Sequence, residues 1–539
     1  MKEKILIILQ ARMSSKRLPY KSAALVQSIP LAILCALRLS NKGHDLIIAT
    51  SKDSSDDYLV QLCNQYKINF FRGDLNNVLN RYIQCTAGLD NKTIIVRATA
   101  DNPLNDGSIV NYAVHQFKKN SLNYFTMPIT STNLPIGLGV EVIRLSKLRK
   151  VFNSRHSKLD EEHVTWKLAK NFEAKPEYFT KIKIKKKFNY RVTIDNFFDY
   201  CVVMNLLQKC KNIKKLTWKK IINNKKITNL NLNKIYNKKI KHKLILGGAQ
   251  IGMNYGFKDE KMINNNQLNK IFNLMKKKNI NAIDTAQGYD LSEIKLGEKI
   301  NNFQNKKNFY FFNKIREFKN ISKISNDFIR MTIYTNLYLS MYKLKTHHIN
   351  VMMIHSVGNF FKKKELFKNT LLELKKKNFI GDFGISIYTP GELIKVSKQN
   401  FFKFIQIPYN IIDDRWNKNL ILKLKTENKF KIIVRSIFLR GYLIHNTNWP
   451  QWFLEKNFLN KQIKIILKKF NIKNNLQLCM QYVNSINFID YIIIGCNNFK
   501  QFEDNLSAFN ARIFSKSEIK IIDKVIKVEN KKILDARNF

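Results

Sequence analysis

Four side chains in the second half of the sequence form a set that could reduce a carbonyl group. Asp284, Lys314 and His355 each end a short apolar run, and Tyr289 follows five residues after Asp284. A tyrosine phenol is a weak acid with a pKa of about 10. A neighbouring lysine cation favours the phenolate, and an aspartate keeps that lysine charged. A neutral histidine can hold a carbonyl oxygen beside the phenol, so the set suits proton donation while a cofactor delivers hydride.

The elements that would position these residues repeat along the second half. Apolar runs alternate with helix-length segments, as in a TIM barrel, whose active groups lie at the carboxyl ends of the strands. We therefore predict a (β/α)8 barrel with the four side chains at one mouth. The long gap before the last strand requires more than one helix. The expected strands are Lys243–Leu246, Asn281–Asp284, Phe309–Lys314, Asn350–His355, Phe383–Ser386, Phe404–Ile407, Ile432–Ser436 and Tyr491–Gly495.

A basic segment follows the first apolar run of the chain, Ile5–Leu9. It carries Arg12, Ser15, Arg17 and Lys21. The loop after the first strand of an α/β sheet commonly binds phosphate, and these residues would supply three cations and a hydroxyl group. A solvated basic loop is the alternative for this segment taken alone.

Two aspartates could hold a metal ion beside that loop. Asp101 follows an expected strand at Thr93–Val96, and Asp195 ends Arg191–Asp195, which we also expect to be a strand. Two carboxylates at strand ends beside a triphosphate loop suit Mg²⁺ that bridges phosphates. Each aspartate taken alone would more often cap a helix. Further short apolar runs, such as Leu46–Thr50, alternate with helical patterns, which predicts a mostly parallel α/β sheet covered by helices.

The boundary between the two halves is expected near residue 240. The stretch from about Lys209 to Lys243 is dense in lysine and asparagine, and the strand pattern restarts after it. A chain of 539 residues suits two or three domains. We therefore expect one domain in residues 1–240 and another in residues 241–539. A helical tail of the first domain in the same stretch is an equal alternative.

The charge of the chain is strongly basic. Lys and Arg number 94 against 40 Asp and Glu, a formal net charge of +54. A nucleic-acid-binding protein is one interpretation of such a charge. The lysines are spread over nearly every polar segment without interleaved aromatic residues, which favours a solvated surface and no nucleic-acid partner. The charge would still steer anionic substrates such as nucleotides to the protein.

The cysteines and the lengths of the apolar runs indicate the cellular compartment in which the protein works. Seven cysteines are scattered without a CxxC pair, which argues against a zinc site or a disulfide framework and for a reducing cytoplasm. No apolar run reaches the roughly 18 residues of a membrane span. The N-terminus is typical of a first strand rather than a signal peptide. We expect a cytoplasmic protein without a membrane span, and a homo-oligomer stays open.

The second half, roughly from Lys243 to Asn505, resembles the aldo/keto reductase family. The matching pieces are Leu246–Gly252, Ile283–Tyr289, Ser292-Glu293, Leu296-Gly297, Asn313-Lys314 and Met353–Ser356. The resemblance implies a barrel that uses NADPH or NADH without a metal. It implies Tyr289 as the acid, Lys314 and Asp284 as its tuners, and His355 as the residue that orients the substrate.

The same resemblance implies a set of cofactor contacts. Ser386 and Gln406 would meet the nicotinamide amide, although family members often have Ser-Asn where this chain has Ser386-Ile387. The pyrophosphate would meet Ser436, Leu439 and Gly441, and the adenosine end would lie near Gly495 and Asn505.

The first half, over nearly all of residues 1–205, resembles the cytidylyltransferases of surface-sugar biosynthesis, relatives of the acylneuraminate and spore-coat polysaccharide enzymes. The resemblance implies attack of a sugar oxygen on the α-phosphate of CTP with release of pyrophosphate. Ser14, Tyr20 and Ala100 stand where glycine is usual in the family. The matching pieces are Gln10–Arg12, Arg17–Pro19, Lys21, Ala49–Ser51, Phe71–Asp74, Val78-Leu79, Arg81-Tyr82, Asp101, Pro103, Glu141, Glu162–Thr165 and Asp195.

Together the two halves predict a fused enzyme of activated-sugar synthesis for a cell-surface glycan. One half would join CTP, or another nucleoside triphosphate, to a sugar or sugar acid with Mg²⁺. The other half would carry out redox chemistry on a carbonyl or hydroxyl group. The main alternative is an aldo/keto reductase whose degenerate N-terminal domain only binds nucleotide or serves as a scaffold. A basic nucleic-acid-binding protein is the remaining alternative.

Overall fold

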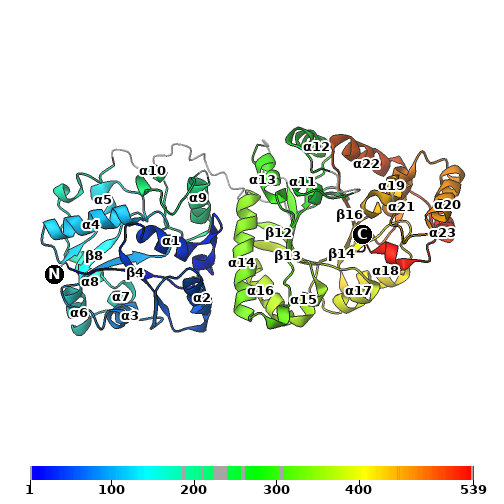
Figure 1. Ribbon diagram of the computed structural model, residues 1–539. Coiled ribbons are helices and arrows are strands. Elements are labelled where there is room, and N and C mark those ends of the chain that lie inside the picture. The colour runs from blue at the N-terminus through cyan, green and yellow to red at the C-terminus, as the bar shows by residue number, and fades with distance from the viewer. Residues whose placement is uncertain are drawn as a thin grey trace. The chain divides into compact units, whose positions relative to one another are not determined.

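The computed structural model describes residues 3–184, 190–208, 210–222, 239–256, 261–302, 309–445, 447, 449–535 and 538. The chain forms two compact units, Met1–Leu230 with Asp327–Leu339 and Asn231–Asn326 with Ser340–Phe539. Strands alternate with helices in both, which confirms the expected α/β class (Figure 1). The boundary near residue 240 stays a prediction.

The first unit is built on a sheet that has six strands within the described residues, in the order β5-β4-β1-β6-β8-β7. Strands β5, β4, β1 and β6 are parallel, and β8 is antiparallel to both β6 and β7. The expected mostly parallel sheet is therefore confirmed. In sheet order the strands span Phe70–Gly73, Asp45–Ser51, Ile5–Gln10, Ile94–Thr99, Glu141–Arg144 and Tyr124–Phe125.

The order of the strands creates a crevice at the carboxyl edge of this sheet. The chain runs from β1 to β4 on one side and later returns to β6 on the other side of β1. The loops after β1 and β6 therefore diverge, and such switch points are where α/β sheets bind ligands. A short hairpin of β2 (Leu25–Val26) and β3 (Ile29–Pro30) follows the first of these loops.

Helices flank this sheet (Figure 1). The run Ile7–Leu9 in β1 is fully buried, because a parallel sheet covered by helices needs apolar side chains on both faces. The helices are α1 Leu31–Leu39, α2 Asp57–Gln65, α3 Val78–Cys85, α4 Gly107–Lys119, α5 Ile129–Thr132, α6 Leu145–Asn153, α7 Lys158–His163, α8 Trp166–Lys170, α9 Phe197–Leu207 and α10 Trp218–Ile222.

The strand expected at Arg191–Asp195 is wrong. Residues 190–196 form an irregular segment that leads into α9, whose N-terminus is closed by a capping box of Asn196 and Asp199. The backbone N–H of Ile194 donates to the carbonyl oxygen of Asp101 over 2.8 Å. The backbone hydrogen bonds of this segment go to loops and not to a strand. Its alternating apolar residues therefore pack against the first unit without joining a β-sheet.

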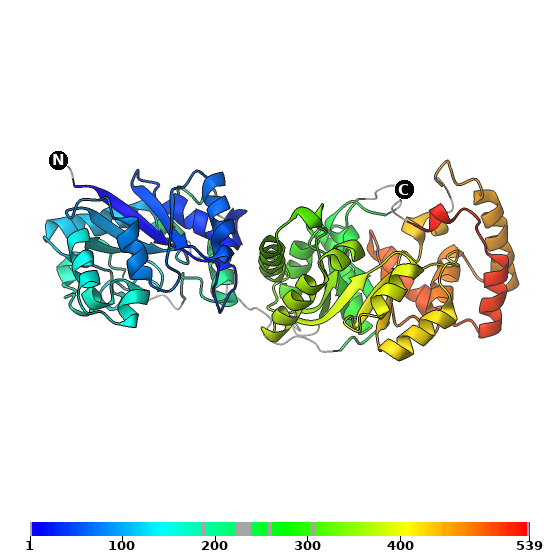
Figure 2. The same cartoon turned by 90° about the horizontal axis from the view of Figure 1, so that it is seen from below.

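The second unit is a closed parallel barrel, which confirms the expected (β/α)8 fold within the described residues (Figure 2). Each strand expected from the sequence is present. Around the barrel the strands are β9 Leu244–Gly247, β10 Ala282–Asp284, β11 Tyr310–Ile315, β12 Ile349–Ile354, β13 Ile380–Ser386, β14 Phe404–Pro408, β15 Lys431–Arg435 and β16 Tyr491–Ile494.

Helices follow the strands of the barrel in turn. The long gap before β16 holds α19, α20 and α21, which confirms that it contains more than one helix. The helices are α11 Ala249–Gly252, α12 Asn265–Lys277, α13 Ser292–Asn302, α14 Asn326–Lys343, α15 Val357–Lys362, α16 Lys364–Lys376, α17 Pro390–Ser397, α18 Lys418–Asn428, α19 Tyr442–His445, α20 Lys456–Lys469, α21 Asn475–Ser485, α22 Phe499–Ala511 and α23 Lys516–Val525.

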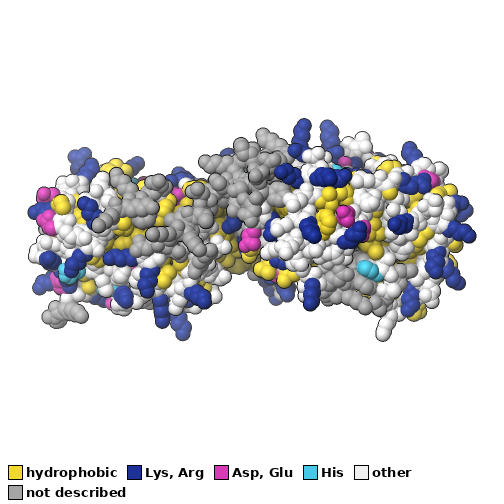
Figure 3. Space-filling model, turned by 90° about the horizontal axis from the view of Figure 1, so that it is seen from above, with side chains coloured by type: hydrophobic (Ala, Val, Ile, Leu, Met, Phe, Trp, Pro, Cys, Tyr) yellow, Lys and Arg dark blue, Asp and Glu magenta, His cyan; other side chains and the backbone are white. Residues whose placement is uncertain are grey.

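The basic charge is dispersed over the one face of the molecule that Figure 3 draws. Figure 3 shows Lys and Arg side chains spread over the visible face among polar and hydrophobic ones, rather than gathered into one patch. No helix among the described residues combines the length and apolar character that a membrane crossing needs.

Candidate functional site

The carboxyl ends of the barrel strands bring polar side chains to one mouth. Ala282 in β10 and Phe312 in β11 belong to the core inside the barrel. Because side chains of a strand alternate between its two faces, Asp284 and Lys314, two residues later, also point inward. His355 comes just after β12, two residues after Met353, which belongs to the same core. The structure thus brings these three residues together as the sequence predicts.

Asp284 and Lys314 form a buried ion pair. The Lys314 Nζ lies 2.5 Å from Asp284 Oδ2, and the two side chains are only 2% and 5% exposed. Burial is the largest single influence and lowers the pKa of Lys314, but the charge and hydrogen bond of Asp284, together with Tyr289, raise that pKa overall. Lys314 therefore stays a cation at neutral pH.

The second oxygen of Asp284 is also used. Gln406, in β14, donates from Nε2 to Asp284 Oδ1 over 3.0 Å, and the Ser386 hydroxyl donates to Gln406 Oε1 over 3.4 Å. Sequence reasoning singled out Ser386 and Gln406 only as nicotinamide contacts and missed their link to the ion pair. The available signal was that Ser386 ends a strand and that Gln406 is a polar residue within the apolar run of the next strand.

Tyr289 is placed by a tight loop after β10. The backbone N–H of Ser292 donates to the Tyr289 carbonyl oxygen over 2.8 Å. A Cβ atom on Gly252 would lie 2.0 Å from that same oxygen, so only glycine allows this approach. Lys314 Nζ lies 5.4 Å from the centroid of the Tyr289 ring.

The ionisation states of Tyr289 and His355 follow from burial and charge. Burial raises the pKa of Tyr289, and the positive charge of Lys314 lowers it by less, so the phenol stays protonated at neutral pH. The sequence-based expectation named only the lysine contribution, which burial outweighs. Burial, followed by the positive charges of Lys314 and Arg435, lowers the pKa of His355 to about 4, so its imidazole is neutral.

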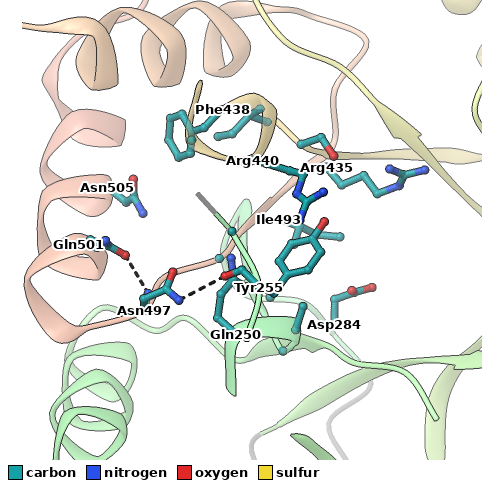
Figure 4. A pocket seen from close by; sticks show the side chains of 18 of the residues that line it. Gln250, Tyr255, Asp284, Arg435, Phe438, Arg440, Ile493, Asn497, Gln501 and Asn505 are labelled. Atoms are coloured by element: carbon teal, nitrogen blue, oxygen red, sulfur yellow. Dashed lines mark hydrogen bonds between the residues drawn. The ribbon is translucent and has the colours of Figure 1, made fainter. Parts of the chain in front are cut away.

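All four residues line a cavity of about 390 Å³, a size that suits a small molecule. Of the expected cofactor contacts, Gln406, Ser436, Gly441, Gly495 and Asn505 line this cavity. Ser386 and Leu439 are buried, and their side chains do not line the cavity. Figure 4 shows that the wall also carries side chains that sequence reasoning missed, which are Gln250, Tyr255, Arg435, Arg440, Asn497 and Gln501.

The wall segment after β15 has an unusual backbone. Ser436, Leu439 and Arg440 have φ values of +59°, +48° and +55°, in the left-handed region. This region costs a non-glycine residue about 1–2 kcal/mol. Such strained residues cluster at ligand-binding sites.

In the first unit, a buried carboxylate holds the basic loop after β1. Asp56 Oδ1 accepts from the backbone N–H of Met13 over 2.7 Å. Its other oxygen accepts from the Thr50 hydroxyl and from the backbone N–H of Ser51, at the end of β4. Sequence reasoning missed Asp56, because only the fold brings the ends of β1 and β4 together.

Lys21 joins the two predicted metal ligands. Its Nζ lies 2.8 Å from Asp101 Oδ2 and 3.7 Å from Asp195 Oδ1. Arg17 and Arg191 also contact Asp195, at 2.8 Å and 2.6 Å. Burial is the largest single influence and raises the pKa of Asp101, but Lys21 and the hydrogen bond from Thr99 together lower that pKa overall. The structure therefore places both carboxylates around one point.

The other two predicted phosphate ligands lie on the same loop. The Arg12 side chain is exposed, and its carbonyl oxygen accepts from the Ser22 hydroxyl. Ser15 Oγ accepts from the backbone N–H of Leu18 over 3.4 Å. Tyr20 has a φ of +58°, so the loop keeps the left-handed turn for which glycine is the favoured residue.

The donor set for Mg²⁺ in the first unit is incomplete by itself. Among the described residues there is no group of three or more His, Cys, Asp or Glu that could hold a metal ion. Mg²⁺ is often bound by one or two carboxylates together with substrate phosphates and water. Asp101 and Asp195 fit that pattern if phosphate oxygens supply the remaining ligands.

A second cavity, of about 210 Å³, lies beside Asp101. Glu141 on its wall is bonded to Arg97 over 2.5 Å and accepts from the Tyr124 hydroxyl over 2.8 Å. The neighbours Thr99 and Asn102 complete the wall on the Asp101 side. This cavity could accept a second substrate next to the phosphate loop.

The two halves match two different protein families. Residues 243–527 match the model of the aldo/keto reductase family, and residues 6–241 match the cytidylyltransferase model. An uncharacterised protein of Methanocaldococcus jannaschii is 32% identical over 243 residues, which are 43% of this chain and 95% of that protein. The spore coat polysaccharide biosynthesis protein SpsF of Bacillus subtilis is 29% identical over 221 residues, 38% of this chain and 87% of that protein.

Solved structures of both kinds are similar to the chain. A cytidylyltransferase from Leptospira borgpetersenii has a TM-score of 0.37 and 24% identity, and the match covers 41% of this chain and 92% of that one. The holo form of an aldo-keto reductase from Bacillus halodurans has a TM-score of 0.43 and 19% identity, covering 53% of this chain and 94% of that one.

Burial and the neighbouring positive charges predict the pH at which His355 becomes protonated. Because its pKa is lowered to about 4, we expect its imidazole NMR signal to stay constant from pH 8 to about pH 5 and to move only near pH 4. The folded state binds this proton less readily than the unfolded chain, so the free energy of unfolding should fall as the pH drops from about 6.5 towards 4. His355→Asn assigns the signal, and a midpoint near pH 6.5 would contradict the prediction.

Proposed function

The chain belongs to the aldo/keto reductase family, and on that basis we propose that its second half reduces a carbonyl group with NADPH or NADH. The observation that carries this proposal is the cavity in which a protonated Tyr289 lies beside the buried Lys314–Asp284 pair. A neutral His355 completes the set. These residues have complementary roles in the transfer of one proton.

The proton would come from Tyr289. The cofactor, when bound, supplies the hydride that forms the new C–H bond at the carbonyl carbon. The Tyr289 phenol gives its proton to the carbonyl oxygen, which becomes the alcohol, and the positive charge of Lys314 stabilises the phenolate that remains. His355 donates a hydrogen bond to the same oxygen and holds the carbonyl in place.

The cofactor would bind the residues at and after the ends of β13 to β16, beginning beside the ion pair, where Gln406 bonds Asp284. We assign Ser386 and Gln406 to the nicotinamide amide, and the segment of Ser436, Leu439 and Gly441 to the pyrophosphate. Gly495 and Asn505 would lie at the adenosine end. The strained backbone of the segment after β15 supports its role in ligand binding.

For the first half, which matches the cytidylyltransferase model, we propose nucleotidyl transfer from CTP to a sugar or sugar acid. Lys21, Arg17 and Arg12 would neutralise the phosphates, and Ser15 would donate a hydrogen bond. Asp101 and Asp195 would hold Mg²⁺, which supplies charge neutralisation at the phosphates. The remaining catalysis is the positioning of the acceptor oxygen, for which the cavity beside Glu141 is available.

A second candidate is that this half only binds nucleotide or serves as a scaffold. Tyr20, in place of glycine at a left-handed position, favours it, because glycine permits a closer approach of the backbone to a phosphate than a residue with a side chain does. Release of pyrophosphate from CTP distinguishes the two candidates.

The two activities would serve one pathway, the synthesis of an activated sugar for a surface glycan. The similarity to SpsF, which is described as a spore coat polysaccharide biosynthesis protein, supports this proposal. Domains 1–240 and 241–539 would carry the two reactions, in the cytoplasm, where nucleotides and reduced cofactors are available.

A prediction for the barrel site concerns Tyr289→Phe, which keeps the ring and removes the acidic proton. We expect turnover to fall about 10²–10⁴-fold, the usual contribution of a general acid. Most of the proposed cofactor contacts lie on later strands, so NADPH binding should persist. The measurement is NADPH oxidation with 4-nitrobenzaldehyde, alongside a fluorescence titration of the cofactor. Tyr310→Phe, which makes the same change in the barrel core, is the control. Near-normal turnover of Tyr289→Phe with normal cofactor binding would show that another group donates the proton.

A prediction for the first unit concerns Asp101→Asn. The substitution removes one of the two carboxylates proposed to hold Mg²⁺, so pyrophosphate release from CTP should fall at least about a hundredfold. Asp90→Asn, at an exposed loop position, is the control and should keep the activity. Full activity of Asp101→Asn would refute the metal assignment. No release by the parent protein with any nucleoside triphosphate would support the scaffold candidate instead.

A further inference from the structure

Arg435 lies in the same inward-facing layer as the proposed catalytic residues. It ends β15, two residues after Ile433, which belongs to the core inside the barrel. Its side chain is partly buried and lines the cavity together with Tyr289 and Lys314. The chain therefore places a permanent cation at the mouth of the barrel in addition to Lys314 (Figure 4).

Two contacts from the end of β13 hold Arg435. Its guanidinium carbon lies 4.4 Å from the centroid of the Tyr388 ring, and Nη2 donates to the carbonyl oxygen of Ile387 over 3.4 Å. Across the described residues, Arg435 makes no ion pair with an Asp or Glu. The stacking fixes the plane of the guanidinium and leaves most of its N–H donors available.

The charges of the cavity wall do not balance. Among the described lining residues Asp284 is the sole carboxylate, and Lys314 already neutralises it. Arg435 then remains on this wall as a cation without an acidic partner among the described residues. Removing a cation from water without a counterion is unfavourable, so a bound anion would stabilise this arrangement.

The two arginines lie at different parts of the cavity. Arg440 lies over the Tyr255 ring, 5.3 Å from its centroid, within the segment that we assign to the cofactor pyrophosphate. The positive charge of Arg435 instead acts on the reaction centre. It lowers the pKa of His355, and it also lowers the pKa of Tyr289, although burial raises the pKa of Tyr289 by more. Arg435 is thus close enough to meet a group on the substrate itself.

We propose that Arg435 binds an anionic group of the carbonyl substrate, a carboxylate or a phosphate. The proposal rests on the carbonyl reduction proposed above and names its substrate class: a carbonyl compound that carries an acidic group. A guanidinium matches both kinds of anion with two parallel hydrogen bonds. The contact orients the carbonyl towards Tyr289 and selects against neutral aldehydes.

The test compares substrates that differ only in charge. The full-length protein is assayed by NADPH oxidation with 4-carboxybenzaldehyde and 4-nitrobenzaldehyde, which have nearly the same shape. A second pair, glyceraldehyde 3-phosphate and glyceraldehyde, distinguishes phosphate from carboxylate. We expect kcat/KM to be at least tenfold higher for the charged member of one pair. Arg435→Gln should reduce that preference at least tenfold, mainly through KM, and Arg435→Lys should retain part of it.

Arg440→Gln is the matched control, because it removes the other arginine of the same wall. It should keep the substrate preference and weaken NADPH binding. The proposal is overturned if the parent protein shows no preference in either pair, or if Arg435→Gln keeps it. It is also overturned if Arg435→Gln weakens NADPH binding as Arg440→Gln does, because Arg435 would then bind the cofactor. The same holds if Arg435→Gln lowers kcat equally for charged and neutral aldehydes and shifts the pH profile, because Arg435 would then act only on the reaction centre. If bound NADPH is oxidised with none of the aldehydes, the proposed reduction fails first, and this proposal fails with it.

Discussion

The buried ion pair between Lys314 and Asp284 is the interaction on which the barrel site depends. Two charges inside a protein are unfavourable unless each is compensated, and breaking such a pair typically costs about 3–5 kcal/mol. Asp284 is compensated twice, by Lys314 and by Gln406, so one carboxylate links strands β10, β11 and β14. The pair also keeps a positive charge beside Tyr289 and His355, which adds to the effect of burial in keeping the imidazole neutral. The chemistry of the cavity therefore follows from one contact.

The first unit uses the same residue types in a more open setting. Lys21 lies between Asp101 and Asp195, but these side chains are 16%, 24% and 13% exposed, unlike the pair in the barrel. Partly solvated contacts are weak and can be exchanged for other partners. The phosphates of a nucleotide could thus take over Lys21 and Arg17, and the freed carboxylates could then bind a cation. The buried pair suits a permanent role, and the exposed cluster suits ligand exchange.

Most of the fold was predictable, because short apolar runs at strand spacing are a local property of the sequence. The gathering of Asp284, Lys314 and His355 was also predictable, since parallel strands of a barrel present their carboxyl ends at one mouth. The segment Arg191–Asp195 was not, because its alternation of apolar residues arises from packing against loops. Contacts such as those of Asp56 and Gln406 join residues far apart in the sequence. Local sequence patterns do not predict such contacts. They also do not predict that Arg435 has no acidic partner among the described residues.

In the proposed mechanism, Lys314 acts on catalysis through the proton of Tyr289. A double-mutant cycle on NADPH oxidation tests this claim directly, with Tyr289→Phe, Lys314→Met and the double variant compared in forms that still bind NADPH. If both residues serve one proton transfer, the double variant should be about as slow as Tyr289→Phe alone, because Lys314 has no remaining phenol to act on. If the two losses multiply, Lys314 acts independently of Tyr289, and the account of the barrel site is wrong.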